Sequence, residues 1–464
     1  MQRIERVVNG LRTAVIVDGD TPMKLADRMN ELHVPGVSIA VIHGGAIEWA
    51  RGFGNAVIGG PPVGPETLFQ AGSISKPVTA VAALALVQAG KLDLDADVNL
   101  ALRSWRIPRH PFSQSKVTLR RLLSHSAGTT VSGFAGYQAG QPIPSLAEIL
   151  DGTPPANSAP VRVEHEPGKQ TQSSGGGYAI VQQLLIDVTG RPFPALLDDT
   201  VLAPIGMTRS SFAQPLPADR LRMAAMPYQA NGVPVPGGPH IYPELAAAGL
   251  WSTPTDLAHL LLVVLDALAG RANCLLSQSM AAGMFSPVLG NVDVLPPGLG
   301  LYGLGWLVRG STPNRQFWHN GVNDGFVNTM VLFENGEGAV VMTNGWGGQV
   351  LVGEILRSIA AEYCWPDRQP RVRKLAAVSP QALDRLLGTY QFTPTFSICI
   401  TREGDRVFSQ ATGQARNEVF PESDRDFFFK VVDAVLSFDA DSPTAAMQLN
   451  FRQDGKDHVA KRAS

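Results

Sequence analysis

The sequence predicts an α+β domain of about 365 residues followed by a small all-β domain. Two strand hairpins, at residues 37–52 and 326–343, lie near the two ends of the first part and enclose a stretch with helical periodicity. After the second hairpin the chain becomes rich in proline and basic residues, and it then continues in short alternating segments typical of a sandwich or barrel. We therefore expect domains at 1–365 and 381–464, joined by a linker at 366–380.

Composition and charge narrow the class of protein. Of the 464 residues, 44% are hydrophobic and 17% charged, which is enough to build a large core. A net charge of -2 argues against a basic surface for nucleic acid, and no apolar run is long enough to span a membrane. Residues 1–6 show no apolar signal-peptide core, so we expect a cytoplasmic protein, or a periplasmic or secreted one if a leader has been removed.

The sequence shows no metal or cofactor motif. Cys274, Cys364 and Cys399 are widely separated, and we expect small buried side chains rather than a disulfide framework. The histidines show no ligand spacing with cysteines or acids, and the glycines at 175–177 lack the lysine of a phosphate-binding loop. We therefore expect no metal and no cofactor, and the oligomeric state is not predicted.

The first third of the chain combines a hairpin with helices. A helix at 23–33 is expected to end before a Val-Pro-Gly sequence. The apolar run 37–42 predicts a buried strand, which a Gly-Gly turn joins to a partner strand at 46–52. The alanine-rich run 78–89 predicts a buried helix that ends near Gly90.

The middle of the chain is mostly helical. A short helix is expected at 118–128, and the Gly-, Pro- and Ser-rich stretch 129–168 predicts a long loop that walls a site. Apolar residues at helical spacing follow Gly175-Gly176-Gly177, and another helix is expected at 194–202. The helix at 253–269 has threonine, proline and an acid in the positions preferred at a helix start.

The last part returns to strands. An Asn-Gly turn between 326–333 and 338–343 is the strongest short hairpin signal, and a helix is expected at 349–363. After the linker, a short helix at 381–387 precedes alternating segments separated by glycine turns. The strands expected there lie at 396–400, 406–408, 427–432 and 447–451.

The motif Ser73-Ile74-Ser75-Lys76 precedes the alanine-rich helix. Residues three apart on a helix are neighbours, so Lys76 is expected to lie beside Ser73. A serine hydroxyl becomes nucleophilic when a base takes its proton, and a lysine whose pKa is lowered by burial can do so. The alternative is a helix-capping serine with a solvated lysine, since this short pattern also occurs by chance.

Further motifs follow in order along residues 20–365: Leu122-Leu123-Ser124-His125-Ser126-Ala127-Gly128, Pro167-Gly168 with Gly175-Gly176-Gly177-Tyr178, the stretch 248–257, and His319-Asn320-Gly321. With the Ser73 motif they resemble the serine β-lactamase and penicillin-binding-protein superfamily, most of all its branch of class C β-lactamases, D-alanyl-D-alanine carboxypeptidases, family VIII esterases and transesterases. The resemblance implies a β-lactamase-like antiparallel sheet flanked by helices, plus an all-helical subdomain. The all-β domain is similar to the lipocalin-like module of some members.

By this resemblance Ser73 is the acylated nucleophile and Lys76 handles its proton. His319-Asn320-Gly321 corresponds to the Lys-Thr-Gly or His-x-Gly strand motif, in which Gly321 lets the substrate backbone approach. The N–H of Val322 would form an oxyanion hole with that of Ser73.

Four further residues have less direct roles. By the resemblance, Asn320 and Gly175 are expected to bind substrate. His319 is expected to hydrogen-bond the substrate or tune the charge of the site, with a buried core histidine as the alternative. His125 more plausibly fixes a loop.

Ser173 departs from the family pattern. In the family, the motif that precedes the Gly175-Gly176-Gly177 run is usually Tyr-x-Asn or Tyr-Ser-Gly. In this chain Ser173 occupies the position of that tyrosine. A phenol can act as general base and acid, whereas a serine hydroxyl does not ionise near neutral pH. The chain is therefore a natural variant that uses Lys76 or water, an engineered form that traps a complex, or an inactive relative. Tyr178 is expected in the packed face of its helix.

The leading hypothesis is a serine hydrolase or acyltransferase that cleaves a small-molecule ester, amide or peptide through a Ser73 acyl-enzyme. The substitution Ser173→Tyr is predicted to raise acylation or deacylation by orders of magnitude. The rival hypothesis is a penicillin-binding-type sensor or binding protein that has lost turnover. An α/β-hydrolase is set aside because the sequence lacks the G-x-S-x-G elbow.

Overall fold

The structure is a computed structural model, and the described residues are 2–112, 114, 116–272, 275–289, 300–439, 445–453 and 455–463. The chain divides into two compact units. The described residues of one lie within Ala26–Leu295 and Leu299–Val352, and those of the other lie within Met1–Leu25 and Gly353–Ser464. The predicted domain limits at residues 365 and 381 remain predictions. None of the described helices is both long and apolar enough to cross a membrane.

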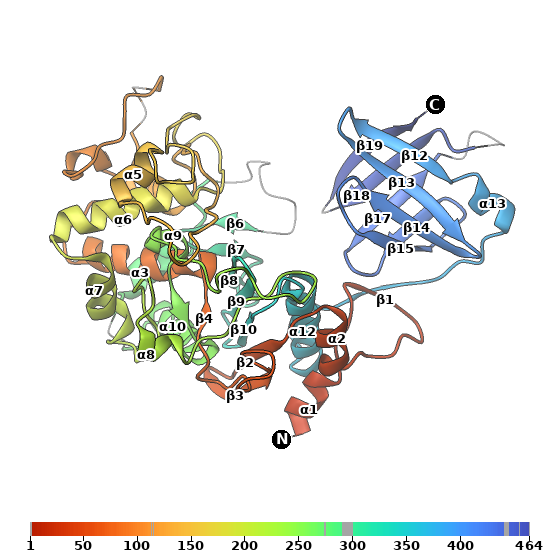
Figure 1. Ribbon diagram of the computed structural model, residues 1–464, viewed down its shortest axis with the longest axis horizontal. Coiled ribbons are helices and arrows are strands. Elements are labelled where there is room, and N and C mark those ends of the chain that lie inside the picture. The colour runs from red at the N-terminus through yellow and green to blue at the C-terminus, as the bar shows by residue number, and fades with distance from the viewer. Residues whose placement is uncertain are drawn as a thin grey trace. The chain divides into compact units, whose positions relative to one another are not determined.

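The larger unit is built on a seven-stranded antiparallel sheet with the order β3-β2-β10-β9-β8-β7-β6 (Figure 1). Its strands are β2 (Gly36–His43), β3 (Ala46–Gly54), β6 (Leu301–Tyr302), β7 (Leu307–Arg309), β8 (Gln316–Asn323), β9 (Phe326–Phe333) and β10 (Gly338–Thr343). Both predicted hairpins are confirmed, and the pairing of β2 with β10 joins them into one sheet. Every residue of β9 and β10 is buried, and both strands are mostly apolar, as expected for strands covered on both faces of a sheet.

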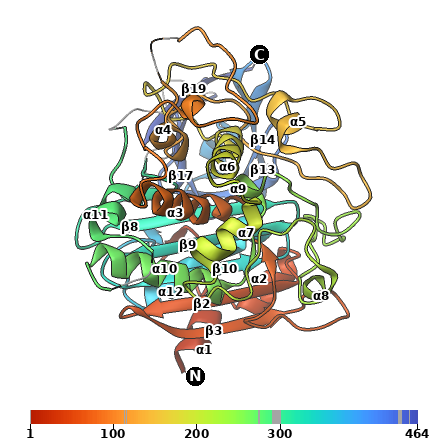
Figure 2. The same ribbon diagram turned by 90° about the vertical axis from the view of Figure 1, so that its left-hand side faces the viewer.

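Helices of the same unit cover the sheet. Figure 2 shows α3 (Ser75–Gln88) and α10 (Pro254–Leu268) in front of the strands. The start of α10 is as predicted, since the Thr253 side chain accepts the N–H of Asp256 and Pro254 is the first helical residue. The other helices are α2 (Leu25–Glu31), α4 (Leu119–Leu123), α5 (Leu146–Asp151), α6 (Gly175–Thr189), α7 (Phe193–Leu197), α8 (Ala218–Leu221), α9 (Leu245–Ala248) and α11 (Gln278–Met284), with 3₁₀ turns at Gly72–Ile74 and Val98–Leu100 and a π-helical turn at Asp198–Leu202.

Two expectations are corrected by the structure. The stretch 129–168, predicted as a loop, contains α5, which begins with a capping box between Ser145 and Glu148. That Ser-x-x-Glu pattern was the signal in the sequence. Cys364, predicted to be buried, is exposed and Cys399 is half-buried, while Cys274 lies outside the described residues.

The C-terminal part of the smaller unit is a closed barrel of eight antiparallel strands, β12 to β19 (Figure 1). They are β12 (Gly388–Thr393), β13 (Phe396–Glu403), β14 (Arg406–Ala411), β15 (Arg416–Pro421), β16 (Asp426–Phe429), β17 (Ala434–Phe438), β18 (Gln448–Gln453) and β19 (Lys456–Arg462). The sequence predicted only half of these strands. Strands such as β15 and β19 each bury a single residue, Val419 and Ala460, so they lack the alternating apolar pattern that indicates a strand. The barrel interior is filled by side chains that include Tyr390, Phe427, Leu436 and Leu449.

The rest of the smaller unit includes α1 (Gln2–Val8), α12 (Gly348–Glu362, which begins in the larger unit) and α13 (Pro380–Asp384). Within the predicted linker, β11 (Arg371–Arg373) pairs in parallel with β1 (Val15–Val17). Val15 and Val17 pack against Phe428 and Val435 of the barrel. The N-terminal segment is therefore tied to the C-terminal part of the chain by both backbone pairing and apolar contact.

Candidate active site

Ser73 lies in a tight turn that leads into α3. The preceding strand β4 (Phe69–Gln70) pairs with β5 (Trp251–Ser252), and the 3₁₀ turn Gly72–Ile74 follows directly. Gly72 has φ +58°, a conformation that favours glycine. The N-cap of α3 is Ile74 and makes no side-chain cap bond, so Ser73 is not a capping serine. The alternative interpretation of Ser73 as a helix-capping serine is therefore wrong.

Lys76 points its amine at the Ser73 hydroxyl. Its Nζ lies 2.7 Å from Ser73 Oγ and 3.1 Å from the carbonyl oxygen of Ala247. Only 4% of Lys76 is exposed, and burial lowers its pKa to about 7. A substantial fraction of this amine is therefore neutral near neutral pH and has a lone pair for the serine proton.

Ser75 and Thr79, on α3, hold the segment that supplies the Ala247 carbonyl. Ser75 Oγ donates to the carbonyl oxygen of Gly72 and accepts the N–H of Leu250. One turn later Thr79 Oγ1 donates to the carbonyl oxygen of Ala246. These bonds explain physically why the predicted motif at 248–257 belongs beside the Ser73 motif.

Strand β8 runs directly against the Ser73 turn. A Cβ on Gly321 would lie 1.8 Å from the carbonyl oxygen of Ala71, and a Cβ on Gly72 would lie 2.6 Å from the backbone nitrogen of Val322. No side chain fits at either glycine, so the two backbones can approach this closely only because both residues lack one. The backbone of Val322 is thereby brought next to the turn that carries Ser73.

His319 lies on β8 and is a neutral imidazole. Its Nδ1 donates to the carbonyl oxygen of Asn320, 2.5 Å away. Burial and the charge of Lys76 lower the pKa of His319 to about 3. The side chain is 8% exposed, so it is buried as a core histidine would be, yet close enough to Lys76 to respond to its charge. Both sequence alternatives stay open.

The first four residues of β8 are buried, and from His319 to Asn323 buried and exposed residues alternate. Asn320 and Val322 are exposed, and Asn320 Oδ1 accepts a bond from Thr329 of the neighbouring strand. Asn323 is buried and donates to Gln70 Oε1 at 3.0 Å and to the carbonyl oxygen of Ala248.

A second buried amide, Asn328 on β9, donates to the carbonyl oxygen of Gln70. The amides of Gln70, Asn323 and Asn328 thus tie the sheet to the strand before Ser73. The sequence did not indicate this network, because single amides carry no motif.

His125 holds the loop that contains Ser173, as the sequence predicted. Its carbonyl oxygen accepts the N–H of Gln172, and its Nδ1 accepts the N–H of Ser174. Ser173 lies between these two anchored residues and is exposed. Burial, together with the charge of Lys76, lowers the pKa of His125, so its ring is neutral.

The residues after Ser173 begin α6. Ser174 is the N-cap and accepts the N–H of Gly177. Gly175 is buried and donates its N–H to the carbonyl oxygen of Ser132. These contacts place Gly175 in the packing of the loop and do not test its predicted role in substrate binding.

Two tyrosines flank His125. Tyr178 is fully buried, as predicted, and its hydroxyl donates to the carbonyl oxygen of Leu123. Tyr302, at the end of β6, meets the His125 ring edge-on with the ring centroids 4.6 Å apart. Burial raises the pKa of the Tyr302 phenol. The sequence analysis missed Tyr302, because no local pattern distinguishes a tyrosine in a short strand.

Glu244 precedes α9, the helix that carries the Ala247 carbonyl. Its side chain is fully buried, and neither carboxylate oxygen has a hydrogen-bond partner among the described residues. Burial raises the pKa of Glu244 to about 7. This carboxyl group is therefore protonated over most of the acidic range, and its ionisation opposes folding.

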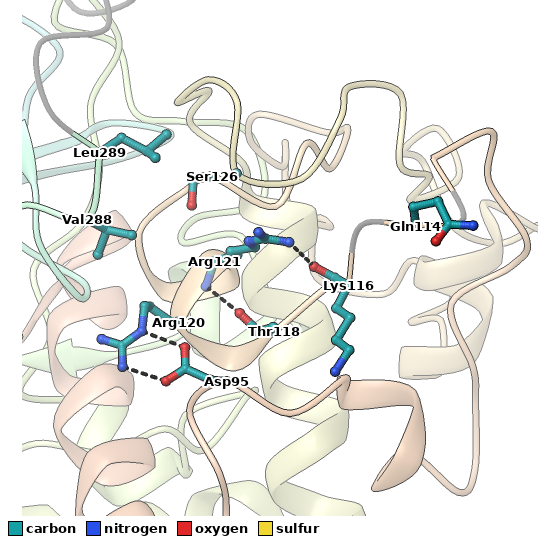
Figure 3. Close-up of a pocket in the computed structure, with 10 residues that line it drawn as sticks. Asp95, Gln114, Lys116, Thr118, Arg120, Arg121, Ser126, Val288 and Leu289 are labelled. Carbon is teal, nitrogen blue, oxygen red and sulfur yellow. Dashed lines mark hydrogen bonds and ion pairs between the residues drawn. The ribbon is translucent and has the colours of Figure 1, made fainter.

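A separate cavity of about 470 Å³ adjoins the His125 loop (Figure 3). Its two arginines are engaged in the fold: Arg120 pairs with Asp95, and Arg121 donates to the carbonyl oxygen of Lys116. Ser126, the residue after His125, lines this cavity, but neither Ser73 nor Lys76 does. The chemistry described above therefore lies outside this cavity.

Comparison with known proteins identifies two matching segments. Residues 24–362 match the family model described as Beta-lactamase, and residues 372–462 match a domain of unknown function, DUF3471. Penicillin-binding protein 4 of Amycolatopsis lactamdurans is 28% identical over 78% of this chain and 94% of its own length. Penicillin-binding protein 4* of Bacillus subtilis is 22% identical over 94% of this chain and 97% of its own length.

Solved structures share the fold. The octameric penicillin-binding protein homologue from Pyrococcus abyssi superposes with a TM-score of 0.66 at 22% identity, covering 94% of this chain and 98% of that chain. A D-alanine carboxypeptidase from Burkholderia cenocepacia gives a TM-score of 0.58 at 18% identity, covering 78% of this chain and 99% of that chain. At these identities the likeness establishes the α+β fold.

Proposed function

This chain belongs to the beta-lactamase family over residues 24–362, and on that premise we propose that it is a serine hydrolase or acyltransferase acting on a carboxylic ester or amide. The observation that carries the proposal is the 2.7 Å contact between Lys76 Nζ and Ser73 Oγ. A buried amine with a pKa of about 7 is suited to take up and return a proton at neutral pH.

The proposed reaction has two stages. Ser73 Oγ bonds to the carbonyl carbon of the substrate while its proton passes to Lys76, and the N–H groups of Ser73 and Val322 stabilise the oxyanion. The close approach of β8 to the Ser73 turn at Gly72 and Gly321 supports this oxyanion hole. The leaving group departs with the proton that Lys76 took up. Water then attacks the acyl-enzyme, its proton passes to Lys76, and Lys76 returns it to Ser73 Oγ as the acyl bond breaks. In acyl transfer another nucleophile takes the place of water.

A non-catalytic binding protein is the competing function, and Ser173 is the observation that favours it. The usual tyrosine is absent from this position, so proton transfer to the leaving group or from water lacks the customary phenol. A protein of this kind would keep the fold and bind an acyl donor without turning it over.

Covalent labelling tests the proposal. A fluorophosphonate and a fluorescent β-lactam are added to the protein, and mass spectrometry locates the adduct. We expect one adduct on Ser73, lost in Ser73→Ala and kept in Ser279→Ala, which removes an exposed serine of α11. A wild-type protein that no acyl donor labels would refute the acyl-enzyme and leave the binding protein.

The substrate class is tested by comparing turnover side by side. The relatives named above are penicillin-binding proteins and a D-alanine carboxypeptidase, so nitrocefin and D-alanyl peptides are the first candidates, with p-nitrophenyl esters as general acyl donors. Release of product beyond one equivalent per Ser73 would establish turnover. A single equivalent would indicate a trapped acyl-enzyme.

A further inference from the structure

We propose that Asn328 is the positioning residue of the oxyanion hole, because its carboxamide joins the turn that carries Ser73 to the strand that carries Val322. The proposal rests on the proposed function of Ser73 and deepens it by naming what holds the two N–H donors in place. Asn328 acts through the backbone and not by contact with the substrate.

Asn328 is a buried amide in the mostly apolar strand β9, and only 1% of it is exposed. Its Nδ2 donates to the carbonyl oxygen of Gln70 at 2.8 Å and to that of Gly321 at 3.4 Å. Its Oδ1 accepts the N–H of Thr343, on β10, at 3.3 Å. A buried amide destabilises a core unless it is hydrogen-bonded, and here both ends of the carboxamide are. The oxygen is fixed by the sheet, and the nitrogen bridges two backbone carbonyls.

The bond to Gly321 fixes the direction of the Val322 N–H. These two groups belong to one peptide unit, and a trans peptide points its C=O and its N–H in opposite directions. The Gly321 carbonyl is bonded to Asn328 on the neighbouring strand β9, so the Val322 N–H points away from β9. The Ser73 turn lies against this nitrogen, since a Cβ on Gly72 would be 2.6 Å from it.

The bond to Gln70 fixes the start of the turn. Gln70 ends β4 and lies three residues before Ser73. Its carbonyl oxygen is bonded to Asn328. The N–H of the same peptide unit, that of Ala71, donates to the carbonyl oxygen of Leu250 at 2.8 Å. The peptide that leads into the Ser73 turn is thus held at both of its polar ends.

One carboxamide therefore binds both backbone segments that supply the oxyanion donors. Two N–H groups stabilise an oxyanion only if both point at the same oxygen position. The missing side chains of Gly72 and Gly321 allow the two backbones to approach, but they supply no attraction. The Asn328 bonds supply it. Losing one oxyanion donor outright slows catalysis by about 10²–10³-fold, and we expect misdirecting the donors to cost about tenfold or more.

The test reads the oxyanion hole through a phosphorus atom. With a fluorophosphonate, Ser73 Oγ bonds to phosphorus, fluoride leaves and Lys76 takes the serine proton. The phosphoryl oxygen of this adduct takes the position of the oxyanion, so the phosphorus NMR shift reports its hydrogen bonds. The reference is the same adduct denatured in urea, in which the oxyanion hole no longer exists.

We expect the Asn328→Ala resonance to move from the wild-type position toward that of the denatured adduct. Labelling of Ser73 should slow about tenfold or more. For a p-nitrophenyl ester kcat should fall while KM stays the same, because the oxyanion hole acts on the transition state.

Asn344 offers a matched control. It is also buried, donates to the carbonyl oxygens of Asn55 at 3.3 Å and Ala56 at 3.1 Å, and accepts the N–H of Gly36. None of these partners belongs to the Ser73 turn or to β8. Asn344→Ala should therefore lose stability in urea as Asn328→Ala does, yet keep the wild-type resonance and labelling rate. Equal shifts of the resonance in both variants would show a general loss of packing and overturn the proposal.

A wild-type resonance and labelling rate in Asn328→Ala would also overturn it and leave the Ser73 adduct intact. Asn328→Asp carries the same test if Asn328→Ala fails to fold. It keeps the size of asparagine but has at most one proton for two carbonyl oxygens, so its resonance should also move toward that of the denatured adduct. Absence of any Ser73 adduct in the wild-type protein would instead refute the proposed function, and the positioning role with it.

Discussion

The buried amine of Lys76 lies 2.7 Å from the hydroxyl oxygen of Ser73 and 3.1 Å from the carbonyl oxygen of Ala247. The spacing of the two residues follows from one helical turn. The lowered pKa of the amine follows from burial, because water no longer stabilises its charged form. The distance between the two residues is therefore set locally by the helix, whereas the pKa of the amine is set by the packing of the whole fold.

The first prediction concerns pH. Lys76 accepts the serine proton only when neutral, so kcat/KM for a p-nitrophenyl ester should rise with pH and level off above about 7, the pKa of Lys76. His319, with a pKa of about 3, is already neutral there and should not contribute. The pH–rate profile of His319→Asn is the control. If its rise near pH 7 disappears, the titrating group is not Lys76.

A second prediction concerns the glycine of β8. Gly321→Ala would place a methyl group 1.8 Å from the carbonyl oxygen of Ala71 and force β8 away from the Ser73 turn. Labelling of Ser73 should slow by about 10²-fold or more, because one oxyanion donor is displaced. Gly283→Ala is the matched control, since no atom lies within 4 Å of its added Cβ. Equal labelling rates in the two variants would contradict a Val322 oxyanion hole.

A third prediction concerns the residue that departs from the family pattern. Ser173→Tyr would place a phenol directly in the site, on a loop held by His125. We expect acylation or deacylation to accelerate by about 10²-fold, the usual effect of a positioned general acid or base. Stopped-flow measurement of adduct formation and decay would separate the two steps. Unchanged rates for both would remove position 173 from the mechanism.

A fourth prediction concerns stability. Burial raises the pKa of Glu244 from 4.5 to about 7. Below pH 4.5 the folded and unfolded chains are both protonated, but between 4.5 and 7 only the unfolded chain loses the proton. The free energy of unfolding should therefore fall by roughly 3 kcal/mol across this window and stay lower above it.

Glu244→Gln should remove this contribution, because glutamine does not titrate. Urea denaturation of both proteins at several pH values measures the difference. Parallel pH profiles for wild type and variant would show that the Glu244 carboxyl is better solvated than its burial indicates.

Parts of the fold could be predicted because their signals are local. The Asn-Gly hairpin between β9 and β10 and the capped start of α10 depend on neighbouring residues only, and both are confirmed. The helix α5 had a local signal too, its Ser145–Glu148 capping box, which was overlooked among prolines and glycines. Strands such as β15 escaped prediction because a barrel wall buries few of their residues.

The sequence by itself determined that Ser73 and Lys76 are neighbours, since three residues along a helix close one turn whatever surrounds it. Only the tertiary structure decided which groups surround these two residues. Ala247 lies 171 residues after Lys76, and Gly321 of strand β8 packs against the backbone of Ala71. Such contacts depend on how distant segments pack, and packing also sets the burial that lowers the pKa of Lys76. No short stretch of sequence contains that information, because burial is a property of the folded chain.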